Sequence, residues 1–422
     1  MSGGIGSLKM RNYATKLLAH PLFAGSALMV VGSNLGNFFA YVYHLVLGRM
    51  LGPEKYSELA SILSFAALVT ALFSFIGIVV VKFLSSAPGK EVSSYLSWFT
   101  KKTTILATAI LVLTLIGVPF LSQFLRISQT ALFVVPFFLF LFVVGFVYKS
   151  FLQGLLKFKE LVIASNVELG VRLLLGVLLV WAGLSVFGGA LSILIGALIG
   201  FLLARYFLGY HRAGEKIKDF SPGKKVLSYA MPIVLVSIAA NSLYSTDVLL
   251  VKHFFEANQA GIYASLSTLG KIIFFGAAPV SAVMFPMASK NHSLGRGTKK
   301  IFALSVLLTI AICAGVLVIY RFLPNLAIGI LFGDKYLSAS PLLFTFGLFM
   351  SVFTLDVLIV HLYLSIGKTK VAPYLMVVSA VVQAASIWIL HESLFQVIIV
   401  SLWAVSVLLG GLLIYTLYES RR

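Results

Sequence analysis

The sequence predicts an all-α polytopic membrane protein with about twelve transmembrane helices, arranged as two pseudo-symmetric six-helix bundles in a parallel repeat. Composition is the first observation that predicts this fold class. Of the 422 residues 60% are hydrophobic and 11% are charged, and the mean hydropathy is +1.04. A water-soluble domain of this length needs many more charged residues to cover its surface. The lipid bilayer is therefore the expected solvent.

The second observation is that apolar runs of about 20 residues, the length that crosses a hydrocarbon core of about 30 Å, recur from end to end. The first run starts at Pro21. It is too long for the apolar part of a signal peptide, and no cleavage site follows it. The twelve predicted spans are 22–48, 57–83, 103–124, 129–153, 161–183, 186–208, 228–252, 262–287, 301–322, 340–366, 371–390 and 394–416.

The third observation is the uneven distribution of Lys and Arg over the gaps between spans. When a residue in the last five positions of a span is counted with the gap that follows, the termini and the even-numbered gaps hold 24 of these residues and the odd-numbered gaps hold six. Positive charge accumulates on the cytoplasmic side of membrane proteins. We therefore expect a multi-pass protein of the cytoplasmic (inner) membrane with both termini in the cytoplasm. Topology also accounts for the net charge of +19, so no nucleic-acid partner is expected.

The longest gap, 209–226, divides the chain into two halves of six spans and contains the Ser-Pro-Gly of a linker. We expect an N-terminal six-helix bundle over 1–215, with a cytoplasmic N-terminal segment, and a C-terminal six-helix bundle over 216–422. Duplicated halves are common in transporters, which bind substrate between them. Sliding the chain by 207 residues aligns three identical pairs: Asn34 with Asn241, Tyr56 with Tyr263, and Leu59 with Leu266.

Polar side chains inside the predicted spans indicate a binding site, because an ionisable residue near mid-bilayer costs about 2.5–3.5 kcal/mol. The first span places four of them within an arc of about 80° on one helix face. The seventh span repeats this pattern, with a carboxylate at its edge. The residues are Asn34, Asn37, Tyr41 and His44 in span 1; Ser237, Asn241, Tyr244 and Asp247 in span 7; Glu168 and Arg172 in span 5; Ser267 and Lys271 in span 8; Lys149 and Gln153 in span 4; and Asp356 and His361 in span 10.

We expect these groups to line a water-accessible cavity between the halves. Arg172 and Lys271 would make that cavity cationic, which suits a phosphate ligand. Structural interpretations remain open for several of them: the asparagines bond across helices, Glu168 and Arg172 form a neutral pair on one helix, Lys149 extends to the lipid headgroups, and His361 is a packed helix residue.

Catalytic and metal-binding motifs are not expected, so neither a catalytic residue nor a cofactor is assigned. Gly367-Lys368-Thr369 resembles the end of a phosphate-binding loop, but Leu362 stands where that loop needs glycine. The single cysteine, Cys313, excludes a disulfide scaffold, and the histidines are scattered singly. The gaps are too short for a catalytic domain, which disfavours a membrane-bound glycan polymerase or ligase. Gly196-x-x-x-Gly200 predicts close helix packing.

Four stretches of the sequence together resemble one family. The stretch 47–56, LGRMLGPEKY, is similar to the "LGR-x-LGP-x-x-Y" signature of the Wzx-type polysaccharide flippases in the multidrug/oligosaccharidyl-lipid/polysaccharide exporter superfamily. The stretches 247–252 and 260–263 resemble the family's "D-x-x-L…G-x-Y" region. Pro286 stands where that family often has proline, and 331–336, LFGDKY, resembles its "LFG-x-x-Y".

The resemblance implies a V-shaped pair of six-helix bundles that works by alternating access. The implied substrate is a polyprenyl-diphosphate-linked oligosaccharide, flipped across the cytoplasmic membrane and coupled in some members to H⁺ or Na⁺. Membrane lipids and glycan-assembly proteins are the further expected partners. We expect Arg172 and Lys271 to bind phosphate, and Asp247, Asp356 or Glu168 to carry a coupling ion. The residues expected to contact sugar are Asn34, Asn37, Tyr41, His44, Asn241 and Tyr244.

One alternative function belongs to the same superfamily. A multidrug or toxin cation antiporter shares the twelve-span plan but needs an acidic, aromatic cavity for cationic drugs. A cavity dominated by Asp247, Asp356 and Glu168 would favour it.

Overall fold

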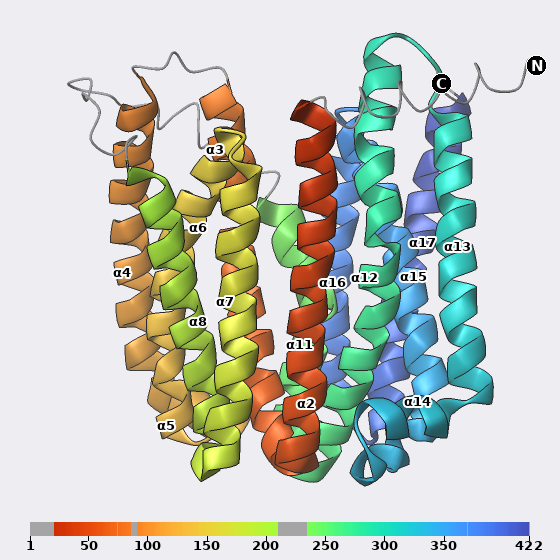
Figure 1. Ribbon diagram of the computed structural model, residues 1–422. Helices are drawn as coiled ribbons and strands as arrows, with labels where there is room; N and C mark the ends of the chain where they lie inside the picture. The colour runs from red at the N-terminus through yellow and green to blue at the C-terminus, as the bar shows by residue number, and fades with distance from the viewer. Residues whose placement is uncertain (1–20, 74, 86–90, 210–233, 369, 422) are drawn as a thin grey trace, which may run out of the picture.

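The computed structural model describes residues 21–73, 75–85, 91–209, 234–368 and 370–421, and within these ranges the chain is helical without a β-strand. The helices run roughly parallel to one long axis (Figure 1). The N-terminal half contains α2 (Pro21–Ala71), α3 (Phe75–Ser85), α4 (Val92–Leu125), α5 (Gln129–Leu132), α6 (Val134–Gly154), α7 (Phe158–Leu179), the π-helical turn η2 (Val180–Leu184) and α8 (Ser185–Phe207).

The C-terminal half begins with a helix over Val234–Leu243 that bends by 43° into α11 (Thr246–Phe254). The remaining elements are α12 (Ala257–Ser293), α13 (Lys299–Phe322), α14 (Pro324–Leu331), the 3₁₀ turn η3 (Asp334–Ala339), α15 (Ser340–Ser365), α16 (Val371–Ile389) and α17 (Leu394–Arg421).

Three predicted spans differ from the helices. Span 1 runs on through Gly52, whose positive φ of 71° breaks α2 just before Pro53. Span 2 is divided, because α2 ends at Ala71 and α3 begins at Phe75. Span 7 is bent at 244–245, and the Gln383 amide donates to the Leu243 carbonyl oxygen at 3.1 Å. That bond satisfies a backbone group at the bend, as backbone inside a membrane requires.

Eight helices in the described part are long and apolar enough to cross a membrane, or nine if the bent pair counts as one span. One of the eight, Phe158–Phe207, covers two predicted spans, because it includes the break at Gly183, where φ is 92°. The expected count of twelve stays a prediction. The expected domain boundary at 215/216 lies in 210–233, outside the described residues.

The two halves of the chain occupy opposite sides of the molecule, with α4 to α8 on one side and α12, α13, α15 and α17 on the other (Figure 1). In the first half α8 packs on α6 and α7, and α6 packs on α4. In the second half α15 packs on α12, α13 and α17. Helix α2 packs on both α7 and α12 and so joins the two groups.

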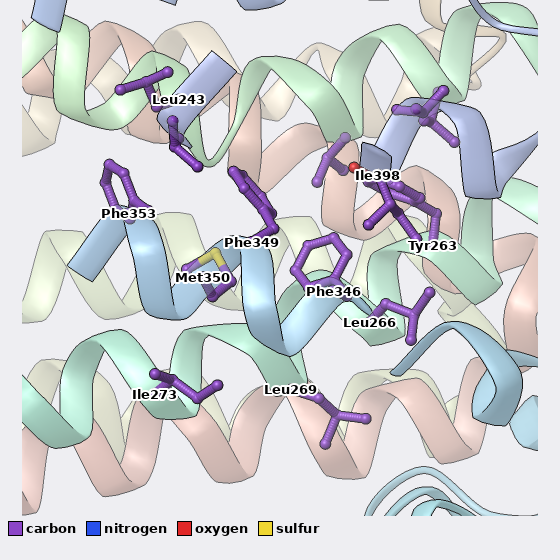
Figure 2. Close-up of a cluster of buried hydrophobic side chains, with 14 of the residues drawn as sticks. Leu243, Tyr263, Leu266, Leu269, Ile273, Phe346, Phe349, Met350, Phe353 and Ile398 are labelled. Atoms are coloured by element: carbon purple, nitrogen blue, oxygen red, sulfur yellow. The ribbon is translucent and has the colours of Figure 1, made fainter. Parts of the chain in front are cut away.

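Aromatic and aliphatic side chains form the centre of the C-terminal half (Figure 2). Phe346, Phe349 and Phe353 of α15 are fully buried in one cluster with Tyr263 of α12. Lipid is as apolar as these side chains, so their close packing, rather than removal from water, holds the helices together. Gly270 permits the approach of α12, since a Cβ there would lie 2.5 Å from the Phe346 ring.

The predicted glycine motif of 196 and 200 does form a helix contact. A Cβ at Gly196 would lie 2.8 Å from the Glu168 carbonyl oxygen, and a Cβ at Gly200 would lie 2.1 Å from the Glu168 carboxylate. Both glycines therefore allow α8 to approach α7 closely.

We expect Gly196→Ala to lower stability by about 1–3 kcal/mol, the usual cost of overpacking, because the atom it meets belongs to the backbone. Gly315→Ala on α13 is the matched control, since a Cβ there meets nothing within 4 Å. Thermal unfolding in detergent, followed by circular dichroism, measures both. Equal melting temperatures for the two variants would contradict the expectation.

Candidate functional site

A cavity of about 670 Å³ lies between the end of α6 and three helices of the second half. Its volume falls within the usual range of ligand sites, about 300–1,000 Å³. The wall is mainly apolar, with a few polar side chains and no Asp or Glu among the described residues. The lining residues are Gln153, Phe274, Ala277, Ala278, Ser281, Ala282, Phe285, Pro286, Thr309, Thr354, Val357, Leu358 and His361.

The halves of the chain contact each other at the opposite end of the molecule, where α14 lies (Figure 1). There the Arg49 guanidinium donates to the carbonyl oxygens of Gly329, at 2.9 Å, and Ile330. The Tyr336 hydroxyl donates to the Gly48 carbonyl oxygen at 2.7 Å. The "LGR-x-LGP" and "LFG-x-x-Y" stretches therefore bind each other across the two halves.

Further contacts join the two halves of the chain. The Lys252 ammonium donates to the Ser57 hydroxyl at 2.8 Å. The His253 ring stacks on Phe124, with ring centroids 4.0 Å apart. A Cβ at Gly261 would lie 1.9 Å from the carbonyl oxygen of Pro53, so only glycine allows α12 to approach the break in α2 this closely.

A polar network crosses between α2 and α12 in the interior. The Tyr56 hydroxyl lies 2.9 Å from the Thr268 hydroxyl and 3.1 Å from Nδ1 of His44. The Tyr41 hydroxyl donates to the Thr268 carbonyl oxygen at 3.3 Å. Tyr41 and His44, both expected to contact sugar, thus lie within contacts between the halves. Asn34 and Asn37 of the same stripe lie nearer the start of α2 and have exposed side chains.

The structure brings Arg172 and Lys271 toward one place from opposite halves. The Arg172 guanidinium lies 4.1 Å from the centre of the Tyr43 ring, and the Lys271 ammonium lies 5.3 Å from that of Tyr244. Both positive charges act on His44 of α2. Neither cation is among the residues that line the 670 Å³ cavity. Lys271 precedes the lining residue Phe274 by three positions and so lies next to it on α12.

The cavity therefore differs from the cationic vestibule that we expected. Its wall is mainly apolar, and neither Arg172 nor Lys271 is part of it. The physical reason is that each cation rests on the face of a tyrosine ring in its own half, an attraction that strengthens away from water.

The three carboxylates expected to couple an ion have different surroundings. Glu168 accepts from the Lys149 ammonium and is not paired with Arg172 on its own helix. Asp247 is fully buried and accepts from the Tyr263 hydroxyl at 2.8 Å. Asp356 is also fully buried, but neither of its carboxylate oxygens has a hydrogen-bond partner among the described residues.

In span 7, the side-chain amide of Asn241 donates to the Ser237 carbonyl oxygen at 2.9 Å and accepts from the Tyr244 hydroxyl. These two expected sugar-contacting residues are thus joined to each other.

Two interpretations were open from the sequence for Lys149 and His361, a place in the cavity or a structural role. Lys149 neither lines the 670 Å³ cavity nor extends freely to headgroups, because it pairs with Glu168 of α7 inside the first half. His361 lies in the cavity wall, where Nδ1 is 2.6 Å from the Ser281 hydroxyl. Pairs between different helices leave no sequence spacing to recognise, so neither partner could be assigned.

Comparison with known proteins identifies the family. The family model described as "Polysaccharide biosynthesis protein" matches residues 22–292, more than half of the chain. The chain belongs to this family. An uncharacterized membrane protein of Methanocaldococcus jannaschii is 24% identical over 283 residues, which are 64% of this chain and 68% of that protein. A second one from the same organism is 27% identical over 126 residues, 28% of this chain and 24% of the relative.

Solved structures with the same fold are transporters. The lipid II flippase MurJ in an inward closed conformation superposes with a TM-score of 0.75 at 15% identity, covering 92% of this chain and 87% of that one. An inward-facing MATE multidrug resistance transporter of the MOP superfamily gives 0.70 at 15% identity, covering 91% and 96%.

A MOP superfamily transporter from Pyrococcus furiosus, described as having a binding pocket of reversed polarity, gives a TM-score of 0.60 at 16% identity, with 96% of each chain covered. This member of the polysaccharide biosynthesis protein family thus has several helices able to cross a membrane and shares its fold with transporters of the MOP superfamily.

Proposed function

We propose that this transporter flips a polyprenyl-diphosphate-linked oligosaccharide across the cytoplasmic membrane by alternating access. The observation that carries the proposal is that each half holds one cation over a tyrosine ring in the interior, Arg172 over Tyr43 and Lys271 over Tyr244, and that both charges act on His44 of α2. Two cations in a low-dielectric site suit the two phosphates of such a carrier, and arginine can bind phosphate through two parallel hydrogen bonds. The exposed side chains of Asn34 and Asn37 on the same face of α2 supply donors and acceptors for sugar hydroxyls.

The mainly apolar cavity, next to Lys271 along α12, fits an amphipathic substrate. A charged headgroup would contact the cations, while carbon groups could lie against Phe274 and Phe285. In alternating access, one end of the transporter is closed while the other is open. The contacts between the halves at the α14 end and the cavity toward the other end fit such a state. The distribution of Lys and Arg favours a cytoplasmic location for the cavity side. We infer that the described arrangement receives substrate from the cytoplasm.

The competing function is export of cationic drugs. An acidic cavity would favour it, but no described lining residue is Asp or Glu, and Asp247 and Asp356 are buried away from the cavity wall. The described lining therefore offers no carboxylate to bind a cationic drug.

The test is transport by purified protein in proteoliposomes with a fluorescent polyprenyl-diphosphate sugar. We expect Arg172→Gln and Lys271→Gln each to reduce flipping about tenfold to hundredfold, the worth of one charge-assisted hydrogen bond. Arg205→Gln, which removes an exposed cation of α8, is the control and should leave the rate within about twofold. Unchanged flipping in both the Arg172→Gln and the Lys271→Gln protein would refute the phosphate roles, and efflux of a cationic dye instead would support the drug exporter.

A further inference from the structure

Glu168 and Arg172 occupy neighbouring positions on one face of α7, four residues apart. A carboxylate four residues before a cation is the order that pairs best on a helix. The described ion pair is a different one: the Glu168 carboxylate accepts from the Lys149 ammonium of α6. The carboxylate thus has two cations within reach and is bonded to one of them.

Packing against α8 leaves the Glu168 carboxylate two possible partners, the Lys149 ammonium and the Arg172 guanidinium. A Cβ at Gly200 would lie 2.1 Å from the Glu168 carboxylate oxygen and 2.9 Å from the Glu168 Cβ. The carboxylate therefore lies directly against the α8 backbone, with α6 on one side and Arg172 along its own helix. The side chains of Lys149 and Glu168 are 18% and 16% exposed, so water screens the pair only weakly.

Arg172 has unused capacity for a ligand. Its Nε is buried and has no hydrogen-bond partner in the described part of the chain. Its guanidinium rests on the Tyr43 ring, and that ring is fixed because the Tyr43 hydroxyl donates to the Gly189 carbonyl oxygen at 2.9 Å. A guanidinium has five N–H donors in a fixed plane, and a buried donor without an acceptor is costly. An anionic oxygen would satisfy it.

We propose that Lys149 is a positioning residue that holds the Glu168 carboxylate away from Arg172 and thereby keeps the guanidinium available for an anionic phosphate group. The inference rests on the proposed role of Arg172 in phosphate binding. Without Lys149, the Glu168 carboxylate rotates along α7 to Arg172, neutralises it and competes with the ligand. The ion pair between α6 and α7 thus tunes the affinity for the headgroup without touching it.

The test is a double-mutant cycle read out as pyrophosphate binding to the purified full-length transporter in lipid nanodiscs, measured by isothermal titration calorimetry. We expect Lys149→Met to weaken binding about tenfold, because one charge-assisted hydrogen bond to Arg172 is lost to Glu168. Lys149→Met combined with Glu168→Gln should restore binding to within about threefold of the unmodified protein, since the competing carboxylate is gone. Lys149→Arg should bind normally, because it keeps the pair.

Lys159→Met, which removes an exposed cation from α7, controls for loss of overall charge and should have no effect. If the double variant binds as weakly as Lys149→Met, Lys149 contacts the phosphate itself and the inference is wrong. Normal binding by Lys149→Met together with loss in Arg172→Gln also overturns it, but leaves the proposed function standing. Normal binding by Arg172→Gln refutes the phosphate role itself. If Lys149→Met does not fold, Lys149→Gln completes the same cycle.

Discussion

Gly261→Val should separate the two halves at the α14 end and reduce transport at least tenfold. Even a Cβ at this position would lie 1.9 Å from the Pro53 carbonyl oxygen and 2.7 Å from the Pro53 Cα. These are backbone atoms beside the break at Gly52, so no side-chain rotation relieves the clash. Overpacking of this kind costs about 1–3 kcal/mol, and a shift of 1.4 kcal/mol changes the ratio of two conformations about tenfold.

Distances between spin labels at Lys55 and Lys335 measure this separation, because both side chains are exposed and a Cβ at Gly52 would approach the Lys335 side chain to 3.9 Å. Cys313 is buried and is replaced by Ala in the labelled protein. We expect the distance distribution of the Gly261→Val protein to shift to longer values. Gly315→Val is the control, since a Cβ there meets open space. An unchanged distribution in the Gly261→Val protein would show that the approach of α12 to α2 does not hold this end closed.

Asp356→Asn should abolish the response of transport to an ion gradient. The Asp356 carboxylate is fully buried, and neither oxygen has a partner in the described residues. A bare charge there would cost several kcal/mol, so the group requires a proton or a bound cation. Asp247 and Glu168 already accept hydrogen bonds from Tyr263 and Lys149. Asp356 is therefore the carboxylate best suited to take up the coupling ion.

Flipping in proteoliposomes under an imposed H⁺ or Na⁺ gradient measures this dependence. The unmodified protein should accelerate with one of the two gradients, and Asp356→Asn should flip at the same rate with and without it. Asp334→Asn, which changes an exposed carboxylate in η3, should behave like the unmodified protein. A gradient response that survives in Asp356→Asn would move the coupling role to Asp247 or Glu168, each of which can be tested in the same way.

The sequence predicted the fold class and most helix positions, because the length and apolarity of a membrane-spanning helix are local properties of the chain. The stripe of Asn34, Asn37, Tyr41 and His44 was likewise visible from helical spacing. The helix breaks were not predicted: Gly52 lies in the stretch that resembles the "LGR-x-LGP" signature, and its positive φ became apparent only in the structure.

Partners between helices were beyond sequence reasoning. Glu168 and Arg172 have the spacing of an ion pair, yet Lys149 from another helix binds the carboxylate, and its approach depends on how α6, α7 and α8 pack. The polarity of the cavity was misjudged for the same reason. Spacing shows which face of a helix is polar but not that Tyr43 and Tyr244 cover the cations.

Helix α2 has a mechanical consequence for the transport cycle. It bears Asn34 and Asn37, which we propose to contact sugar, and packs on α7, where the Asn166 amide donates to the Gly32 carbonyl oxygen at 3.1 Å. It also carries Arg49 and Tyr56, which bind the second half. The part of α2 before the break at Gly52 therefore extends from the proposed headgroup site to the contact of Arg49 with α14. We expect a bound headgroup that displaces this part of α2 to change the backbone angles at Gly52. Such a rotation would separate the contacts between the halves at the α14 end.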